Sequence, residues 1–171
     1  RLVPNGFRVL GLPVSVPDAY GERLTFTPEA TTRWGERYDF DFTPLLRTVP
    51  LAPVTVGLTS PEARALTALA TALVITEVDL SAAVTGIVHG RATATATASG
   101  LINGLLLYFD VFLAPGHTLT TAPDVADETN HWGNRVVLLS APFEVTTGDR
   151  FTIHVERRHG RFSAWCERPH T

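Results

Sequence analysis

The residues best suited to recognition chemistry lie in a loop between two apolar segments. Thr120 to Pro123 is followed by Asn130, His131 and Trp132, so an imidazole stands next to an indole. Because binding residues often lie on loops held by a rigid scaffold, this loop is a candidate recognition site. A purely structural interpretation is also open, in which Trp132 closes one end of a barrel and His131 caps a backbone carbonyl.

A second group of candidates lies between Trp34 and Phe42, where aromatic residues are interleaved with acidic ones. Large amphipathic rings dominate the energetics of protein interfaces. The segment is therefore a candidate arm that binds a partner. The alternative is a local aromatic cluster that covers the body of the fold.

Two further patterns are weaker. Glu77 and Asp79 are two residues apart and would share one face of a strand, where paired carboxylates could do acid–base work. No third group marks them as a site. The stretch from His154 to His159 is expected to be a solvated strand end, with a basic phosphate site as the alternative. The sequence contains no glycine-rich phosphate loop, no GxSxG and no HExxH motif, so no motif for a nucleotide or cofactor pocket is present.

The elements that position these residues are predicted to be mostly β-strands. Short apolar segments are separated by 13 glycines and 12 prolines, as in a β-rich chain. The predicted strands are Phe7 to Val16, Ala92 to Ser99, Gly104 to Leu113, Asn134 to Leu139, Phe151 to Glu156 and Arg161 to Glu167. Alternation of alanine and threonine from Ala92 predicts one packed and one solvated face. The more continuous apolar run from Gly104 predicts a central strand.

One segment favours a helix. Ser60, Pro61 and Glu62 offer a capping hydroxyl, a proline at the first helical position and an acid in the first turn. Apolar residues continue at helical spacing, which predicts a short helix over about 60–72 and then a strand to about Leu80. Residues 31 to 53 fit neither pattern, and about 20–51 are expected to form an arm-like excursion. The whole chain, 1–171, is thus expected to be a single mostly β domain: an antiparallel β-barrel with one short helix and an aromatic excursion.

Composition limits the classes of function. Of 171 residues, 44% are hydrophobic and 18% are charged, which excludes a disordered chain. The net charge of −3 gives no basic footprint for nucleic acid or an anionic membrane, and Leu101 to Ala114 is too short to span a bilayer. The lone Cys166 suggests a reducing, cytoplasmic location. Because the chain opens on Arg1 and contains no methionine, we expect it to be processed or part of a longer protein.

Several segments together resemble the C-terminal β-barrel half of the protein arginine methyltransferases. Leu2 to Gly6 resembles the family's L-x-P-G-G turn, and Trp34 to Pro44 its W-x-x-x-Y-G-F-D-x-S segment. The other similar segments are Ser60-Pro61, Ile75 to Leu80, Leu107 to Phe112, Thr120 to Trp132 and Leu139 to Asp149. They occur in the family's order and cover nearly the whole chain.

The resemblance implies roles for the candidate residues. His131 would pair with an acid from the family's N-terminal half, and Trp132 would wall the slot that takes the substrate guanidinium. Dimerisation would involve an arm that contains Trp34, Tyr38, Phe40 and Asp41. The chain departs from the family at Asn130, where a threonine is usual, and at Asn134, where a glutamine is usual. The excursion is also shorter than a typical arm.

The resemblance also implies what must come from elsewhere. S-adenosylmethionine would bind a missing N-terminal domain, and the family's cofactor motif and two substrate-gripping glutamates would precede Arg1. We therefore expect this chain to bind an arginine-containing protein or peptide, to form a possible homodimer, and to work with a methyltransferase domain in cis or in trans. Alone it would be inactive and would bind no cofactor or metal. The alternatives are a stand-alone, non-catalytic binding module, and the barrel of a methyltransferase that acts on a non-protein acceptor.

Overall fold

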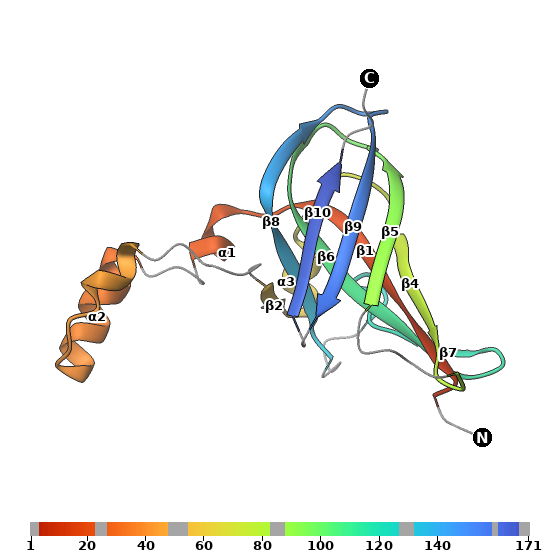
Figure 1. Cartoon of the computed structure of the whole chain (residues 1–171), viewed down its shortest axis with the longest axis horizontal. Coiled ribbons are helices and arrows are strands. Elements are labelled where there is room, and N and C mark those ends of the chain that lie inside the picture. The colour runs from red at the N-terminus through yellow and green to blue at the C-terminus, as the bar shows by residue number, and fades with distance from the viewer. Residues whose placement is uncertain are drawn as a thin grey trace.

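In the computed structural model, the described part of the chain contains ten strands, which form two antiparallel sheets and make up the body of the fold (Figure 1). The structure describes residues 4–22, 27–47, 55–82, 88–126, 132–158 and 161–167. The prediction of a mostly antiparallel β fold is confirmed.

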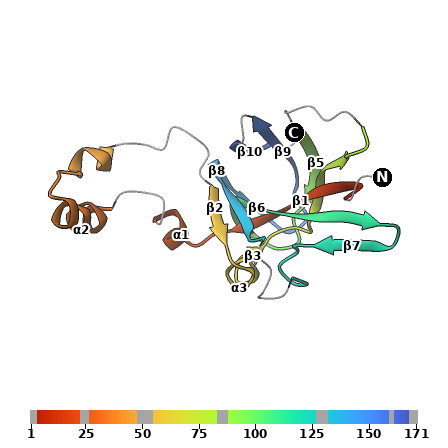
Figure 2. The same ribbon diagram turned by 90° about the horizontal axis from the view of Figure 1, so that it is seen from below.

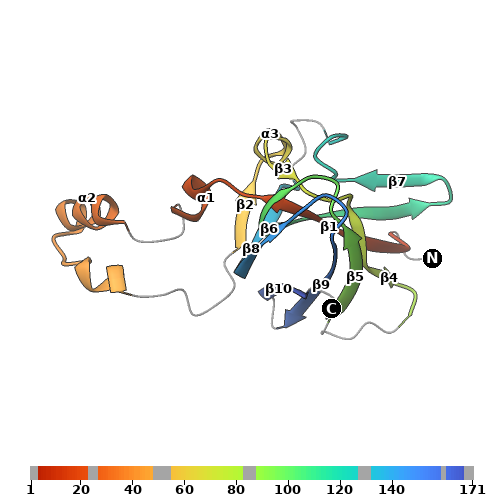
Figure 3. The ribbon, with the colours of Figure 1, turned by 90° about the horizontal axis from the view of Figure 1, so that it is seen from above.

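The larger sheet is centred on two long strands, β1 (Gly6–Ser15) and β6 (Gly100–Ala114). On one side, β8 (Asn134–Val145) pairs with β6, and β2 (Thr55–Leu58) pairs with β8. On the other side, β3 (Thr67–Ala68) and β4 (Leu73–Asp79) pair with β1. The short β7 (His117–Thr120) pairs with the far end of β6, and this hairpin extends away from the body of the fold (Figures 2 and 3). The predicted central position of β6 is confirmed.

The smaller sheet has the order β10–β9–β5, from β5 (Val88–Thr95), β9 (Arg150–Arg158) and β10 (Arg161–Glu167). It faces the larger sheet, with β5 beside β4 and β10 beside β8. No strand ladder between described residues crosses either seam. The expected barrel is thus built from two sheets that enclose a core.

The main core lies between the two sheets. Its fully buried side chains include Phe151 and Ile153 from the smaller sheet and Ile102, Leu105 and Val137 from the larger one. The inward alanines of β5, and Ala96 just beyond it, alternate with exposed threonines, as the period-two pattern predicted. Their small size leaves room for bulkier neighbours from the opposite sheet.

A second core covers the outer face of the larger sheet. Val14, Leu106 and Val136 pack there against Leu58 and against Ala63 of helix α3 (Ser60–Arg64). The helix starts with a capping box, in which Thr59 Oγ1 accepts from the Glu62 N–H and the Glu62 carboxylate accepts from the Thr59 N–H.

The helix predicted over about 60–72 is therefore too long. It ends at Arg64, and Thr67 and Ala68 pair with β1 as strand β3. The helical spacing of apolar residues had a different origin: Ala63 and Leu66 belong to the outer core, whereas Leu69 and Ala70 belong to the inner one. Two cores, rather than one helix face, produced the periodicity.

Residues that precede β2 form the arm. It contains α1 (Asp18–Glu22), α2 (Pro28–Tyr38) and the 3-10 helix η1 (Thr43–Arg47). α2 starts at an N-cap, Thr27, whose hydroxyl accepts from the Ala30 N–H at 3.1 Å, and ends where Asp39 takes a left-handed conformation with φ of 51°. α2 stands apart from the sheets (Figures 1 and 2). The sequence indicated an excursion here but not its helices, so the prediction of one short helix is incomplete.

Candidate functional site

Trp132 lies two residues before β8, and about half of its surface (49%) is exposed. Its ring centroid is 5.6 Å from that of Phe109 on β6, and the two planes are tilted by 42°. The next residue, Gly133, passes close to β2, because a Cβ there would lie 3.0 Å from the carbonyl oxygen of Leu58. The indole thus rests on one strand and is available to solvent. His131 lies outside the described residues, so its role stays a prediction.

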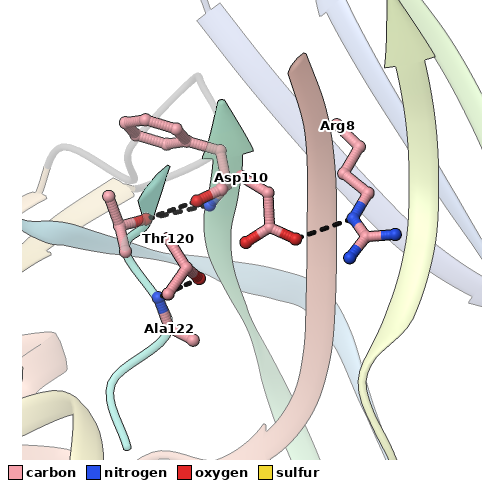
Figure 4. A network of polar contacts seen from close by, with 6 residues as sticks. Arg8, Asp110, Thr120 and Ala122 are labelled. Atoms are coloured by element: carbon pink, nitrogen blue, oxygen red, sulfur yellow. Dashed lines mark hydrogen bonds and ion pairs between the residues drawn. The ribbon is translucent and has the colours of Figure 1, made fainter. Parts of the chain in front are cut away.

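The backbone of Phe109 is fixed by Thr121, which is fully buried. Thr121 Oγ1 accepts from the Phe109 N–H at 2.9 Å and donates to the Phe109 carbonyl at 3.2 Å, and the Thr121 N–H donates to the same carbonyl at 2.9 Å. The Ala122 N–H donates to Thr120 Oγ1 at 3.1 Å (Figure 4). These contacts hold the beginning of the loop against the strand that supports Trp132.

An ion pair crosses from β1 to β6 next to this site (Figure 4). Arg8 Nε lies 2.7 Å from Asp110 Oδ2, and the Asp110 side chain is only 9% exposed. The Arg8 guanidinium also lies over the ring of Phe112, 5.8 Å from its centroid. Burial, together with the charges of Asp124 and Asp110, raises the pKa of Tyr108, so its hydroxyl stays protonated at neutral pH.

Sequence reasoning placed Thr121 in the candidate loop without a role of its own, and it gave no role to Phe109 or to the Arg8–Asp110 pair. A signal for the pair was present, because Asp110 is the one charged residue in the apolar run from Leu105 to Leu113. A buried carboxylate needs a partner, and Arg8 lies in the neighbouring strand. No comparable signal indicated the hydrogen bonds between Thr121 and Phe109, since these depend on the path of the loop.

Three of the four predicted arm residues, Trp34, Tyr38 and Phe40, lie in one aromatic cluster on the arm together with Phe42. Trp34 lies 5.8 Å from Tyr38 and 5.6 Å from Phe42 between ring centroids, and Phe40 lies 5.3 Å from Phe42. Trp34, Tyr38 and Phe40 are exposed, and α2 does not lie on the sheets. The alternative that this aromatic cluster covers the body of the fold does not fit that placement.

A cavity of about 370 Å³ opens on the arm between α2 and the segment 39–43. Thr31, Thr32 and Gly35 of α2 line one side, and residues 39–43 line the other. Asp41 accepts from the hydroxyl and the N–H of Thr43, and these hydrogen bonds lower the pKa of Asp41 below its usual value. Its carboxylate is therefore charged at neutral pH.

The two weaker sequence patterns are accounted for by local contacts. Asp79 accepts from the hydroxyl and the N–H of Ser81, which lower its pKa. His154 is stacked on Trp165 at 5.0 Å and 3°, and its Nε2 lies 3.0 Å from Glu167. With its side chain only 15% exposed, His154 is not the solvated residue that was predicted. The carboxylate beside it disfavours a phosphate at this point.

Within the described ranges, no group of three or more histidine, cysteine, aspartate or glutamate side chains is placed to hold a metal ion. In that same part of the chain, no helix has the length and apolar character needed to cross a bilayer.

Comparisons with known proteins agree with this arrangement. The chain resembles the PRMT1 enzyme–prozyme heterotetrameric complex of Trypanosoma brucei with AdoHcy (15% identity, TM-score 0.62, covering 96% of this chain and 55% of that one). It resembles protein arginine methyltransferase 10 of Arabidopsis thaliana to the same degree (16% identity, TM-score 0.62, covering 96% and 59%). The chain thus spans just over half the length of these structures. No curated protein matches the sequence. Residues 23–165 match the family model for the arginine methyltransferase oligomerization subdomain, so this chain belongs to the arginine methyltransferase family.

Proposed function

We propose that this chain is the acceptor-binding and dimerisation part of a protein arginine N-methyltransferase-like protein that uses S-adenosylmethionine. The observation that carries the proposal is the half-exposed indole of Trp132, which packs against Phe109 with the two rings tilted. Family membership supplies the class of acceptor, an arginine side chain in a protein or peptide.

The geometry around Trp132 suits a planar cation. A guanidinium stacks favourably on an aromatic face, and an indole is the strongest such partner. The hydrogen bonds between Thr121 and Phe109 hold the backbone that carries the supporting ring, which reduces the entropy lost when an acceptor binds. The residues of this chain therefore have the task of holding and orienting the acceptor.

S-adenosylmethionine supplies the methyl group in this family, and the sequence offers no glycine-rich loop to hold it. We infer that a methyltransferase domain, in cis or in trans, binds it. His131 is proposed to pair with an acid of that domain. The chain alone is expected to transfer no methyl group, and calorimetry that found micromolar binding of S-adenosylmethionine to it would contradict this.

Dimerisation is assigned to the arm. Trp34, Tyr38 and Phe40 form an exposed aromatic cluster, and such clusters are typical of the energetic centre of an interface. The family model that matches residues 23–165 is that of an oligomerization subdomain. The arm is thus proposed to join two copies of the chain.

The test uses this chain together with its methyltransferase domain. Trp132→Ala should lower kcat/KM for an arginine-containing peptide by at least about tenfold, because the stacking surface is lost. The melting temperature should fall by no more than about 2 °C, since the indole is half exposed. The control is Leu101→Ala, which removes a similarly exposed apolar side chain near the start of β6, away from Phe109. It should leave kcat/KM and the melting temperature near those of the wild type. Parallel losses of activity and melting temperature in Trp132→Ala would instead show that the residue only packs.

A further inference from the structure

Arg135 is an exposed arginine on β8, three residues after Trp132. In the larger sheet it lies opposite Gly57 of β2 on one side and Leu107 of β6 on the other. Neither of these neighbours has a polar side chain to pair with a guanidinium. Among the described residues, Arg135 forms no ion pair. Its positive charge is therefore not neutralised within this part of the sheet.

Arg135 lies on the same face of the sheet as the ring that supports Trp132. Residues directly opposite in an antiparallel pair share a face, so Arg135 shares the face of Leu107, and Phe109 is the next residue of β6 on that face. Diagonal neighbours of this kind are about 7–8 Å apart, a distance that an arginine side chain can bridge. Because the Phe109 ring packs against Trp132, Arg135 is within reach of the proposed acceptor site.

The sheet leaves open space next to Arg135. Gly57 is exposed, and a Cβ added there would meet nothing within 4 Å. Further along the same face of β8, Val137 and Leu139 belong to the core between the two sheets. Arg135 thus lies where this face of β8 leaves the core and meets solvent, with β2 beside it (Figure 2). A peptide bound at Trp132 can therefore extend over Gly57 without meeting a side chain at that position.

A second positive charge beside a site for a guanidinium calls for a counter-charge, because like charges at this spacing repel each other. We propose that Arg135 selects acceptors that carry a carboxylate close to the target arginine, an inference that rests on the proposed role of Trp132. The planar guanidinium of Arg135 offers paired N–H groups that match a carboxylate in two parallel hydrogen bonds.

The carboxylate has two possible sources in an acceptor. In an extended peptide, residues two positions apart project to the same side, so an aspartate or glutamate at that spacing reaches Arg135 while the arginine lies on Trp132. The free carboxyl group of an acceptor that ends in the target arginine offers the same chemistry.

The test measures kcat/KM for matched peptides, with this chain joined to its methyltransferase domain. Two blocked peptides carry an aspartate two residues before or two residues after a central arginine, and their counterparts carry asparagine. A third pair ends in the arginine, with a free carboxyl group or an amide. In at least one pair we expect the wild type to prefer the carboxylate by about three- to tenfold, mainly through a lower KM, because the ion pair adds binding energy. The pair that shows the preference identifies the source of the carboxylate.

Variants of Arg135 separate recognition from packing. Arg135→Gln should abolish the preference, and it should raise kcat/KM for the uncharged peptides, because a charge that repels the bound guanidinium is gone. A residue that only packs would not produce this rise. Arg135→Lys keeps the charge and should keep part of the preference. The control is Arg91→Gln, which neutralises an exposed arginine on β5 of the smaller sheet and should leave the preference intact.

The outcomes separate this inference from the proposed function. Equal kcat/KM within every pair of peptides in the wild type would overturn the role of Arg135, as would a preference that Arg135→Gln leaves unchanged. An equal loss on all peptides in Arg135→Gln would also overturn it, because the residue would then serve the fold or the contact with the methyltransferase domain. In each of these cases, a selective loss of activity in Trp132→Ala would leave the proposed function standing. If the wild type methylates no arginine-containing peptide, both proposals fail.

Discussion

The hydroxyl of Thr121 binds both polar groups of the Phe109 backbone, accepting from the N–H at 2.9 Å and donating to the carbonyl at 3.2 Å. Thr121 is completely buried. The Thr121 side chain thus adds two hydrogen bonds to the one that its own N–H makes to the Phe109 carbonyl, and together they join the loop to the strand that supports Trp132.

Thr121→Val keeps the shape of the side chain and removes both hydroxyl hydrogen bonds. The partly buried N–H of Phe109 then loses its partner, so we expect the free energy of unfolding in urea to fall by about 1–3 kcal/mol. Thr121→Ser keeps the hydroxyl and should recover most of this loss. Thr118→Val, at an exposed position on β7, should have little effect. If Thr121→Val proves as stable as the wild type, the hydroxyl does not hold the loop.

The seam between β4 and β5 depends on the absence of a side chain at Gly90. A Cβ there would lie 2.5 Å from the carbonyl oxygen of Ile75 and would also overlap the Ile75 side chain. Because a backbone atom is involved, the two strands must separate, and Gly90→Ala should lower stability by about 1–3 kcal/mol in chemical denaturation. Gly57→Ala is the matched control, since a Cβ at that position meets nothing within 4 Å. Equal stability of the two variants would contradict so close a seam.

The strands were predictable because their apolar patterns report burial directly. The alternation from Ala92 corresponds to a strand with one covered face, which is β5. The apolar run from Gly104 corresponds to a strand with both faces covered, which is β6. Boundaries were less predictable: β8 continues to Val145, past exposed Ser140 to Pro142, because ladder pairing with β6 rather than hydrophobicity extends it.

The arm and the site were predictable in part. Thr27, Pro28 and Glu29 form a helix start of the same type as the one found at Ser60, yet α2 was missed because it buries almost no side chain and so shows no apolar stripe. Trp132 and the four arm residues were chosen as candidates from residue type and from the family resemblance, and their roles stay predictions. The contacts that hold them, Phe109 under Trp132 and Phe42 within the arm cluster, depend on distant pairings that one-dimensional patterns do not encode.

Burial controls the chemistry of Cys166, raising the pKa of its thiol from 9.0 to about 12. A neutral, largely buried thiol is a poor nucleophile, so the native chain should react slowly with Ellman's reagent at pH 8 and rapidly in urea. The raised pKa also links folding to pH. The protonated Cys166 thiol contributes fully to the free energy of unfolding below pH 9. This contribution is lost as the pH rises from about 9 to 12, because the thiol ionises in the unfolded chain before it ionises in the folded one. Cys166→Ala should therefore show a shallower loss of stability in that range, and rapid labelling of the native thiol would contradict the assignment.

Asn134, the first residue of β8, is buried with 1% of its surface exposed. Among the described residues neither its Oδ1 nor its Nδ2 has a hydrogen-bond partner. An unpaired buried amide is unfavourable, so Asn134→Val should keep the free energy of unfolding or raise it by up to about 1–2 kcal/mol. Asn134→Asp should lower it by more than any neutral substitution, because a buried charge is costlier still. Urea denaturation of the three proteins measures both effects. A clear loss of stability in the valine variant would contradict the prediction and show that the amide has a partner beyond the described residues.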